Sequence, residues 1–311
     1  MYKRQGNVFP ISVLAIEASR SITVSNLSVH SRSSAFEGVF IAKDSQDVRL
    51  LHLTIDGAGV FGILVGDNSQ ASLAQLTVRD PGYAAVGVYG ATVGIEDCLF
   101  ENSTGANWKA GLDVGAGRVG MHGTTIRNMQ NGMNIQANSN VGLDSGSSYY
   151  PSGGKTDVVI ENPAGTNFCG VCIGTGASLN LNVTLRITNA GQSWGGNTAG
   201  VLVSGGTLAI ASGNGGKLVV SGSYGNGVFV SNSSHVGLEA SSITGSQHGG
   251  LVVVNQSTTA VAWTDPLTVI SGNGTDLFCD SKSLITGGAN IANATSVQCS
   301  NLLPGDYENV P

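Results

Sequence analysis

Three ionisable side chains that lie close together in the sequence could support an elimination reaction on an acidic sugar. Lys109 is a candidate base, Arg118 could neutralise the substrate carboxylate, and Asp113 could hold a sugar hydroxyl or a calcium ion. Such chemistry needs little more than a base and a neutralising cation. Calcium usually takes about six to eight oxygen ligands, so Asp113 would need help from Asp144 or Asp157. Lyase-type catalysis is therefore one hypothesis for these residues, with Ca²⁺ as a candidate cofactor and no other metal site, and a non-catalytic role is the alternative.

A second set of side chains could bind a sugar without reacting with it. Amides exchange hydrogen bonds with hydroxyl groups, and aromatic faces stack on the CH-rich faces of sugar rings. The aromatic candidates lie where the sequence lengthens, around residues 103–109, 142–157 and 190–198. The candidate substrate-binding residues are Trp108, Asn134, Gln136, Tyr149, Tyr150 and Trp194. The alternative is that the aromatic side chains fold back and cover their own loops.

Other classes of function have little support. The chain has 14 Lys and Arg against 20 Asp and Glu, with a formal net charge of −6. Its basic residues are scattered, which argues against nucleic-acid binding. No apolar run approaches the roughly 18 residues that span a bilayer. The five histidines fall at separate places in the sequence, so they predict no metal cluster, and His248 is a weak candidate for a catalytic acid.

The elements that must position these residues come from a repeat. A glycine, or Ala85 in one copy, is followed by an apolar residue, any residue and a second apolar residue. Period-two alternation with β-branched residues predicts short strands, and a repeat of variable length indicates a solenoid. We expect three strands per turn, forming three parallel sheets around a dry core. The repeated position is occupied by Gly38, Gly62, Ala85, Gly111, Gly132, Gly170, Gly200, Gly227 and Gly250.

In each copy the two apolar side chains should point inward and the residue between them outward. This outward column is mostly apolar or small, but it becomes polar at Asp113 and Asn134 in the middle of the stack, with Gln136 just beyond. A different column falls at a corner, where Asn and Gly accept a left-handed conformation. Its successive members are Asn102, Asn128, Asn162 and Asn189. We interpret these Asn as structural and the middle of the outward column as a candidate groove.

The glycine strands, the variable turn length and the Asn corner resemble the right-handed parallel β-helix of the pectate-lyase-like superfamily, over roughly residues 11–275. The resemblance implies an all-β fold with a single coil of about ten turns. We expect the coil to occupy residues 1–275, without an evident N-terminal cap, and a small cap to occupy residues 276–311. Members include polysaccharide lyases, glycoside hydrolases, uronate epimerases and non-catalytic surface passengers, so the fold alone does not choose a function.

This chain lacks motifs that the hydrolases of this superfamily carry. Polygalacturonases of this superfamily carry Asn-Thr-Asp, Asp-Asp and Gly-His-Gly, and none occurs in this chain. A glycoside hydrolase needs two carboxyl groups across the scissile bond. Any enzyme activity should therefore be lyase-like rather than hydrolytic.

Five cysteines leave at least one unpaired within the chain. We expect Cys279 and Cys299, which bracket the C-terminal segment, to form a disulfide. Cys169 and Cys172 form a C-x-x-C pair at the start of a repeat strand, where redox or zinc chemistry has little support. Cys98 falls on an inward position and should belong to the core.

Two hypotheses of function follow. In the first, this is a secreted or cell-surface protein whose glycine-strand sheet binds or cleaves an acidic polysaccharide. In the second, the coil is a non-catalytic surface or passenger module that acts as a spacer or adhesive stalk. Lys3 and Arg4 followed by residues 8–16 imitate a short signal peptide. The spacing of Ser19 and Leu27 instead indicates repeat structure there, and we expect the chain to be part of a longer protein.

Overall fold

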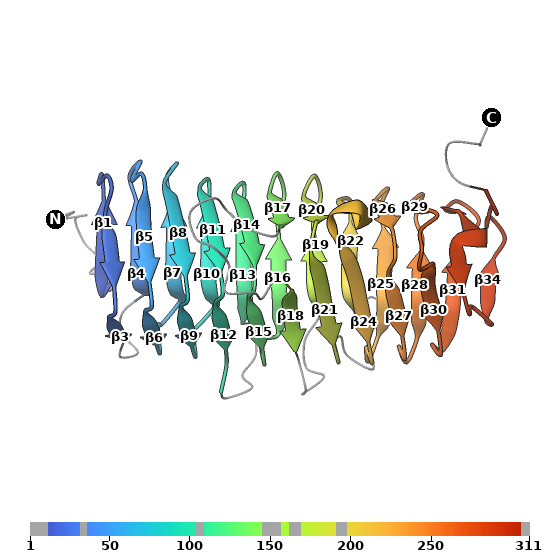
Figure 1. The fold of residues 1–311 in the computed structure, drawn as a ribbon, viewed down its shortest axis with the longest axis horizontal. Helices are drawn as coiled ribbons and strands as arrows, with labels where there is room; N and C mark the ends of the chain where they lie inside the picture. Colours follow the sequence, from blue (N-terminus) through green and yellow to red (C-terminus); the bar gives the residue numbers. More distant parts are fainter. Residues whose placement is uncertain are drawn as a thin grey trace.

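The computed structural model describes residues 12–31, 36–103, 109–144, 157–161, 169–190 and 198–305. The strands in these ranges form three parallel sheets with 12, 11 and 11 members, and each sheet takes every third strand of the chain. Successive turns therefore stack side by side along one axis (Figure 1). This confirms the predicted fold, a right-handed parallel β-helix. Among the described residues no helix is long and apolar enough to cross a membrane.

The first sheet contains the glycine strands. Its strands are β1 (Leu14–Glu17), β4 (Glu37–Ala42), β7 (Phe61–Gly66), β10 (Ala84–Tyr89), β13 (Ala110–Gly115), β16 (Asn131–Ile135), β19 (Cys169–Ile173), β22 (Ala199–Ser204), β25 (Asn226–Ser231), β28 (Gly249–Val253), β31 (Thr275–Cys279) and β34 (Val297–Cys299).

The second sheet follows the first in each turn. Its strands are β2 (Thr23–Ser25), β5 (Val48–Leu51), β8 (Gln70–Ala74), β11 (Thr92–Glu96), β14 (Arg118–His122), β17 (Asn140–Leu143), β20 (Ser178–Leu181), β23 (Thr207–Ile210), β26 (His235–Leu238), β29 (Thr258–Val261) and β32 (Leu284–Thr286).

The third sheet closes each turn. Its strands are β3 (Ser28–His30), β6 (Thr54–Asp56), β9 (Thr77–Arg79), β12 (Leu99–Glu101), β15 (Thr125–Arg127), β18 (Val158–Glu161), β21 (Thr184–Thr188), β24 (Lys217–Ser221), β27 (Ser242–Thr244), β30 (Thr268–Ser271) and β33 (Ile291–Ala292). Two short 3₁₀ helices, η1 (Ser212–Asn214) and η2 (Gly288–Asn290), interrupt the connections.

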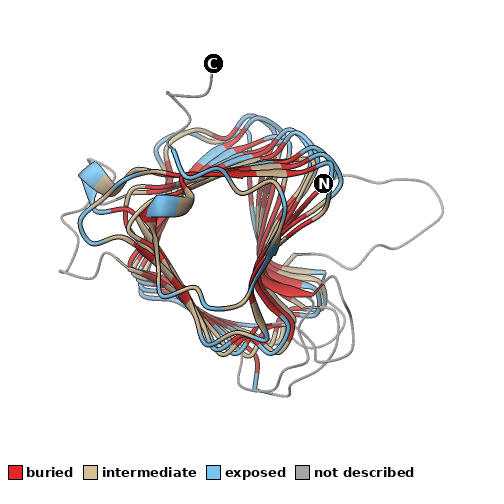
Figure 2. Cartoon of the chain, turned by 90° about the vertical axis from the view of Figure 1, so that its right-hand side faces the viewer, coloured by how far each residue is buried: buried red, intermediate tan, exposed pale blue. Residues whose placement is uncertain are grey.

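One hydrophobic core runs along the inside of the coil. Each sheet contributes aliphatic side chains to every turn, as Ile63, Leu73 and Val78 do, and all three are fully buried. Figure 2, a view along the coil axis, shows the buried positions recurring at the same places around the section. Burying each such side chain contributes about 1.5–3 kcal/mol, so the stack of identical layers holds the turns in register.

The glycine of the repeat is required by the corner that leads from the third sheet into the first. A Cβ on Gly132 would lie 2.6 Å from Ile160 Cγ2 and 2.5 Å from the carbonyl oxygen of Gly170. Gly170 has the same surroundings, with Ile187 Cγ2 at 2.6 Å and the Gly200 oxygen at 2.7 Å. The inward isoleucine on the third-sheet strand of the same turn and the backbone of the next turn thus leave no room for a methyl group, which explains why the motif recurs.

Two of the four predicted corner residues adopt the left-handed conformation. Asn128 and Asn189 have φ angles of 57° and 55°, and Asp80, which occupies the same corner one turn before Asn102, has a φ angle of 50°. Asn102 is not among the residues with positive φ; it is buried and its Oδ1 accepts a hydrogen bond from Lys109 Nζ at 3.2 Å. Asn162 lies outside the described residues. The Asn column therefore marks a structural corner, with Asn102 as an exception.

The coil continues past residue 275, where the sequence suggested that a cap begins. Strands β31, β32 and β33 extend all three sheets, and β34 adds one more strand, with Cys279 opposite Cys299. The glycine signal disappears because Asp276 occupies the glycine position, and its carboxylate accepts backbone N–H donors from Thr295 (2.8 Å) and Ser296 (3.2 Å). A capping role for the last residues stays a prediction.

The structure contains two disulfides. One joins Cys279 and Cys299 across β31 and β34, as expected, and the other joins Cys169 and Cys172 within β19. Cys98 is a free, buried thiol, and burial raises its pKa to about 12. The C-x-x-C pair is therefore a disulfide on the first sheet.

Candidate functional site

The polar patch predicted from the sequence lies on the outer face of the first sheet. Asp113 on β13 is opposite Asn134 on β16, and the next residue of that outward column is Cys172. Asp113 Oδ1 accepts hydrogen bonds from Asn134 Nδ2 (2.6 Å) and Gln136 Nε2 (2.8 Å). The structure therefore brings together the three residues of the predicted patch.

Two tyrosines complete the surroundings of Asp113. The hydroxyl of Tyr89, at the end of β10, donates to Asp113 Oδ2. Burial, together with this hydrogen bond, raises the pKa of Tyr89 well above its usual range. Tyr83 lies just before β10, and burial followed by the charge of Asp113 raises its pKa as well. Both phenols thus stay protonated at neutral pH and act as hydrogen-bond donors.

Asp113 has no exposed surface (0 %) although it lies on the outer face of the sheet. Its two oxygens receive three donors from Tyr89, Asn134 and Gln136. A calcium ion needs oxygen acceptors, whereas these neighbours present N–H and O–H groups. The arrangement does not fit calcium, and the described residues contain no group of three or more His, Cys, Asp or Glu side chains suited to a metal ion.

Aromatic rings border the patch on the side of the earlier turns. Phe61 on β7 packs edge-to-face with Tyr83 (ring centroids 5.5 Å apart) and with Tyr89 (5.9 Å). Gly87 makes room for this ring, because a Cβ there would lie 2.7 Å from Phe61 Cδ1. Tyr83 is 38 % exposed. An accessible aromatic ring therefore lies beside a cluster of polar groups.

The other two residues of the predicted catalytic set lie elsewhere. Lys109 directs its ammonium group to Asn102 at the corner before β13. Burial lowers the pKa of Lys109, and the charge of Asp80 opposes this effect in part. Arg118 begins β14 in the second sheet, whereas Asp113 belongs to the first. A joint role of Lys109, Asp113 and Arg118 stays a prediction.

The four aromatic residues predicted to bind sugar lie outside the described residues. Trp108 and Trp194 belong to connections that lead from the third sheet to the first, between β12 and β13 and between β21 and β22. Tyr149 and Tyr150 belong to the connection from the second sheet to the third, between β17 and β18. The chain thus enters these connections at different corners, and their part in binding stays a prediction.

Sequence reasoning missed a column of ionisable residues on the second sheet. Glu96 and His122 are register partners at the ends of β11 and β14, and His122 Nε2 lies 3.3 Å from Glu96 Oε1. Asp144 follows Leu143, the partner of Met121, so it continues the same column. Both Glu96 and His122 are nearly fully buried. Aligning the stretches Val93–Glu96, Val119–His122 and Val141–Asp144 would have revealed this column.

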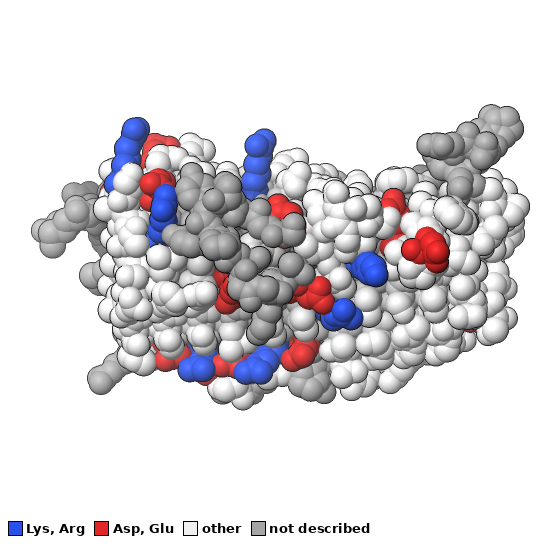
Figure 3. Space-filling model, viewed as in Figure 1, with Lys and Arg blue, Asp and Glu red and all other residues white. Residues whose placement is uncertain are grey.

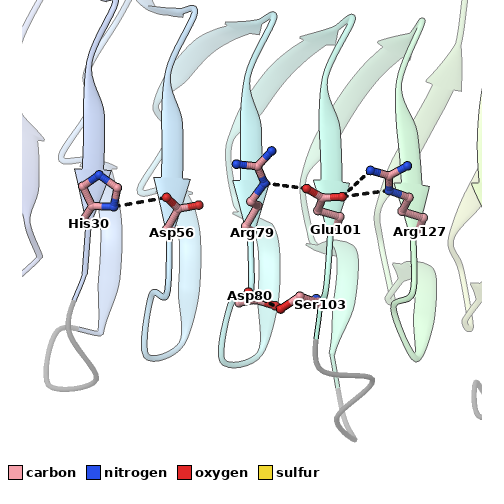
Figure 4. A network of polar contacts seen from close by, with 7 residues as sticks. All are labelled: His30, Asp56, Arg79, Asp80, Glu101, Ser103 and Arg127. Carbon is pink, nitrogen blue, oxygen red and sulfur yellow. Dashed lines mark hydrogen bonds and ion pairs between the residues drawn. The ribbon is translucent and has the colours of Figure 1, made fainter.

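The third sheet carries a ladder of opposite charges on its outer face. In register along this sheet the chain places His30, Asp56, Arg79, Glu101, Arg127 and Glu161. Arg79 Nε donates to Glu101 Oε1 at 2.6 Å, and Arg127 donates to Glu101 Oε2 (Figure 4). Acidic and basic side chains alternate along this edge of the surface (Figure 3). Glu101 pairs with both Arg79 and Arg127, so we interpret the ladder as a stabilising feature.

No protein-family model matches the sequence, and the search of curated proteins found no match. Among solved structures the chain is similar to the periplasmic alginate epimerase AlgG, with 14% identity over 93% of this chain and 78% of that chain, and a TM-score of 0.48. It is also similar to the catalytic domain of a GH87 alpha-1,3-glucanase, with 13% identity over 92% of this chain and 50% of that chain, and a TM-score of 0.35. Likeness at this level concerns the coil alone, and function has to be argued from this chain's own residues.

Proposed function

We propose that the outer face of the first sheet binds carbohydrate. The observation that carries the proposal is the Phe61, Tyr83 and Tyr89 cluster next to the amides of Asn134 and Gln136. An exposed aromatic face can stack on the CH-rich face of a sugar, and neighbouring amides and phenols can exchange hydrogen bonds with its hydroxyl groups. Tyr83 offers the accessible ring, and the hydrogen bonds around Asp113 hold the polar groups in place.

Binding without turnover is what this arrangement supports best. A lyase acting here would need a base and a neutralising cation at the reacting sugar. Asp113 is enclosed, Lys109 is hydrogen-bonded at a corner, and Arg118 belongs to another sheet. An acidic polysaccharide as ligand and lyase-type turnover are the finer possibilities that the sequence suggested, and a binding assay on several polysaccharides can test both.

We also propose an extracellular or cell-surface location. The two disulfides support it, because disulfides form and persist in oxidising compartments and are rare in reducing ones. The Cys169–Cys172 bridge lies one strand away from Asn134, on the same face of the sheet. A location outside the reducing compartments would also place the sheet within reach of polysaccharides.

The test is affinity gel electrophoresis on neutral and acidic polysaccharides. Tyr83→Ala should weaken retention by about 1 kcal/mol, or several-fold, if the ring stacks on sugar, whereas Tyr83→Phe should keep most of it. Trp263→Ala is the matched control, because Trp263 is 69 % exposed and lies between β29 and β30, at the far end of the coil.

Equal retention of the wild type and Tyr83→Ala would overturn the proposed face. Release of unsaturated uronate products, followed by ultraviolet absorbance, would show that the protein is a lyase rather than a binding module. A wild-type chain that is retained on no polysaccharide would favour the spacer or stalk hypothesis.

A further inference from the structure

The outer face of the second sheet has a floor of glycines. Gly94 on β11, Gly120 on β14 and Gly142 on β17 are successive register partners, and Ser72 on β8 precedes them in the same column. Neighbouring strands are about 4.8 Å apart, so three strands in succession present bare backbone to the outside. We call this surface the glycine floor.

Neither backbone conformation nor packing requires these glycines. None of the three has a φ in the left-handed range. A Cβ on Gly94 or Gly142 would meet nothing within 4 Å, and one on Gly120 would meet only Asp144 Oδ2 at 4.0 Å. Glycine inside a strand weakens the strand and often marks a place where a ligand or another backbone approaches closely. The presence of these glycines is therefore better explained by a ligand that approaches this surface than by folding.

Three adjoining hollows lie over the floor. One of about 260 Å³ extends from Asp47 and Arg49 to Gly94 and Gly120. A second of about 680 Å³ extends over Gly120 and Gly142 toward Ser178. A small pocket of about 50 Å³ joins them at Gly94 and Gly120. All three hollows share Gly120, so together they form one groove that crosses the strands from β5 to β20, parallel to the coil axis.

A buried carboxylate lines the small pocket, and one of its two oxygens lacks a hydrogen-bond partner among the described residues. Glu96 is 5 % exposed, and its Oε2 has no hydrogen-bond partner among the residues that the structure describes. His122, 2 % exposed, lies next to it, and Asp144 closes the same pocket. A buried polar atom without a partner is costly. A ligand hydroxyl that reached the pocket would satisfy it.

We propose that this groove is a second binding site, which takes an extended, neutral, hydroxyl-rich glycan. Carboxylates (Asp47, Glu96 and Asp144) outnumber guanidinium groups (Arg49 and Arg118) around the groove, and Arg49 is already paired with Asp47 at 3.0 Å. An anionic polymer would be repelled there. A neutral sugar chain would instead donate its hydroxyls to these carboxylates.

The lining of the groove favours a sugar chain over a peptide. Hydroxyl and amide side chains border the floor, namely Gln70, Ser72, Thr92, Asn138, Asn140 and Ser178. A peptide laid on the face of a sheet finds no free backbone groups, because the sheet uses them in its own ladder. A glycan carries donors and acceptors along its whole length and could exchange hydrogen bonds with these side chains, while the bare floor lets its rings lie close to the backbone.

The test fills the floor and measures retention on neutral polysaccharide. Full-length chains that also carry Tyr83→Ala, which weakens the contribution of the first sheet, are run through gels containing hydroxyethyl cellulose, galactomannan or polygalacturonate. We expect the neutral probes alone to retard this chain. Gly94→Val and Gly120→Val should weaken that retention by about tenfold or more, because a side chain that occupies the floor excludes the ligand. Glu96→Gln should weaken it less.

The matched control is Gly237→Val. Gly237 belongs to the same outward column on β26, opposite Ala260, but lines none of the three hollows. Equal effects of Gly120→Val and Gly237→Val, or no retention on either neutral probe, would overturn the proposal. Histidine-selective NMR gives a second readout that does not depend on the variants, since galactomannan should shift the imidazole signals of His122 and leave those of His235 unchanged. An unshifted His122 would also overturn it.

Discussion

Glycines on the first and second sheets occur for different reasons. In the first sheet a methyl group on Gly132 would collide with Ile160 and with the next turn, so the fold itself requires the glycine. In the same turn a methyl group on Gly142, on the second sheet, would meet nothing within 4 Å. The first kind recurs along nearly the whole coil, and the second is concentrated at three neighbouring strands. Glycines that packing does not require are therefore better pointers to a binding surface than those that define the repeat.

The buried carboxylates of the two outer faces also differ, because one is fully hydrogen-bonded and the other is not. Asp113 on the first sheet is enclosed and receives three donors, so its charge holds neighbouring side chains in place. Glu96 on the second sheet is nearly as buried, yet its Oε2 lacks a partner among the described residues. A fully hydrogen-bonded network holds the side chains of a surface in place. A buried polar group without a partner is costly, and a ligand that supplies the missing hydrogen bond removes that cost. Sequence reasoning noticed the first carboxylate and overlooked the second.

The largest change in stability should come from substituting Gly132, a glycine that packing requires. Gly132→Ala should destabilise the coil by about 1–3 kcal/mol, because the new methyl group overlaps Ile160 and a backbone oxygen that cannot move freely. Thermal unfolding followed by far-ultraviolet circular dichroism measures it. A melting temperature equal to that of the wild type would show that the corner can relax, and steric exclusion would then no longer explain the repeat.

A somewhat smaller loss should follow from changing Asp113. Asp113→Asn keeps the shape but turns one acceptor into a donor that faces other donors, and the loss should be roughly 1–2 kcal/mol. Urea unfolding measures it, with Tyr89→Phe as the milder companion that removes a single donor. If Asp113→Asn left stability unchanged but abolished carbohydrate binding, Asp113 would contact the ligand directly, and the contrast between an organising and an unsatisfied carboxylate would fail.

The sequence predicted the coil, its three sheets and the position of Asp113 beside Asn134, because a packing requirement repeated in every turn leaves a readable pattern. The outward column derived from the glycine positions agrees with the register from Phe40 to Val252. The glycine pattern cannot be followed past residue 275, because Asp276 occupies the glycine position and forms hydrogen bonds there instead.

The parts of the candidate sites that depend on side-chain reach were not predictable. Tyr83 and Tyr89 belong to the turn before Asp113, and only the folded structure shows that their phenol groups meet its carboxylate. Gly94, Gly120 and Gly142 were overlooked because a glycine within a strand looks like a defect until its open surroundings are known. Glu96 was not considered and His122 was considered only as one of five scattered histidines, because their pairing depends on the exact register of β11 and β14.

Substituting alanine for Gly142, a glycine of the floor, should change the stability of the coil in the opposite direction from the same substitution at Gly132. Gly142→Ala should stabilise the coil by about 0.5–1 kcal/mol, since alanine loses less conformational freedom on folding and meets no neighbour there. Parallel thermal melts of Gly132→Ala and Gly142→Ala, which belong to the same turn, give the sharpest form of the comparison. A destabilised Gly142→Ala would mean that the second-sheet glycines also serve the fold, which would weaken the argument for a binding floor.

The smallest change in stability should come from the third sheet, whose outer face carries partly exposed ion pairs. The hydrogen bond from Arg79 to Glu101, together with Arg127, lowers the pKa of Glu101 below its ordinary 4.5. A carboxylate with a lowered folded pKa adds stability above its unfolded pKa and loses it as the pH falls through the folded value. Glu101→Gln should therefore cost less than about 1 kcal/mol at neutral pH, because the pairs are partly exposed.

The difference in the free energy of unfolding between the wild type and Glu101→Gln should disappear in acid and shrink at high salt. Urea unfolding across pH measures it. Glu161→Gln is the matched control, since Glu161 is an exposed member of the same ladder. A difference that persisted unchanged in acid would show that Glu101 contributes through packing. The ladder would then resemble the enclosed carboxylate of the first sheet rather than a set of surface ion pairs.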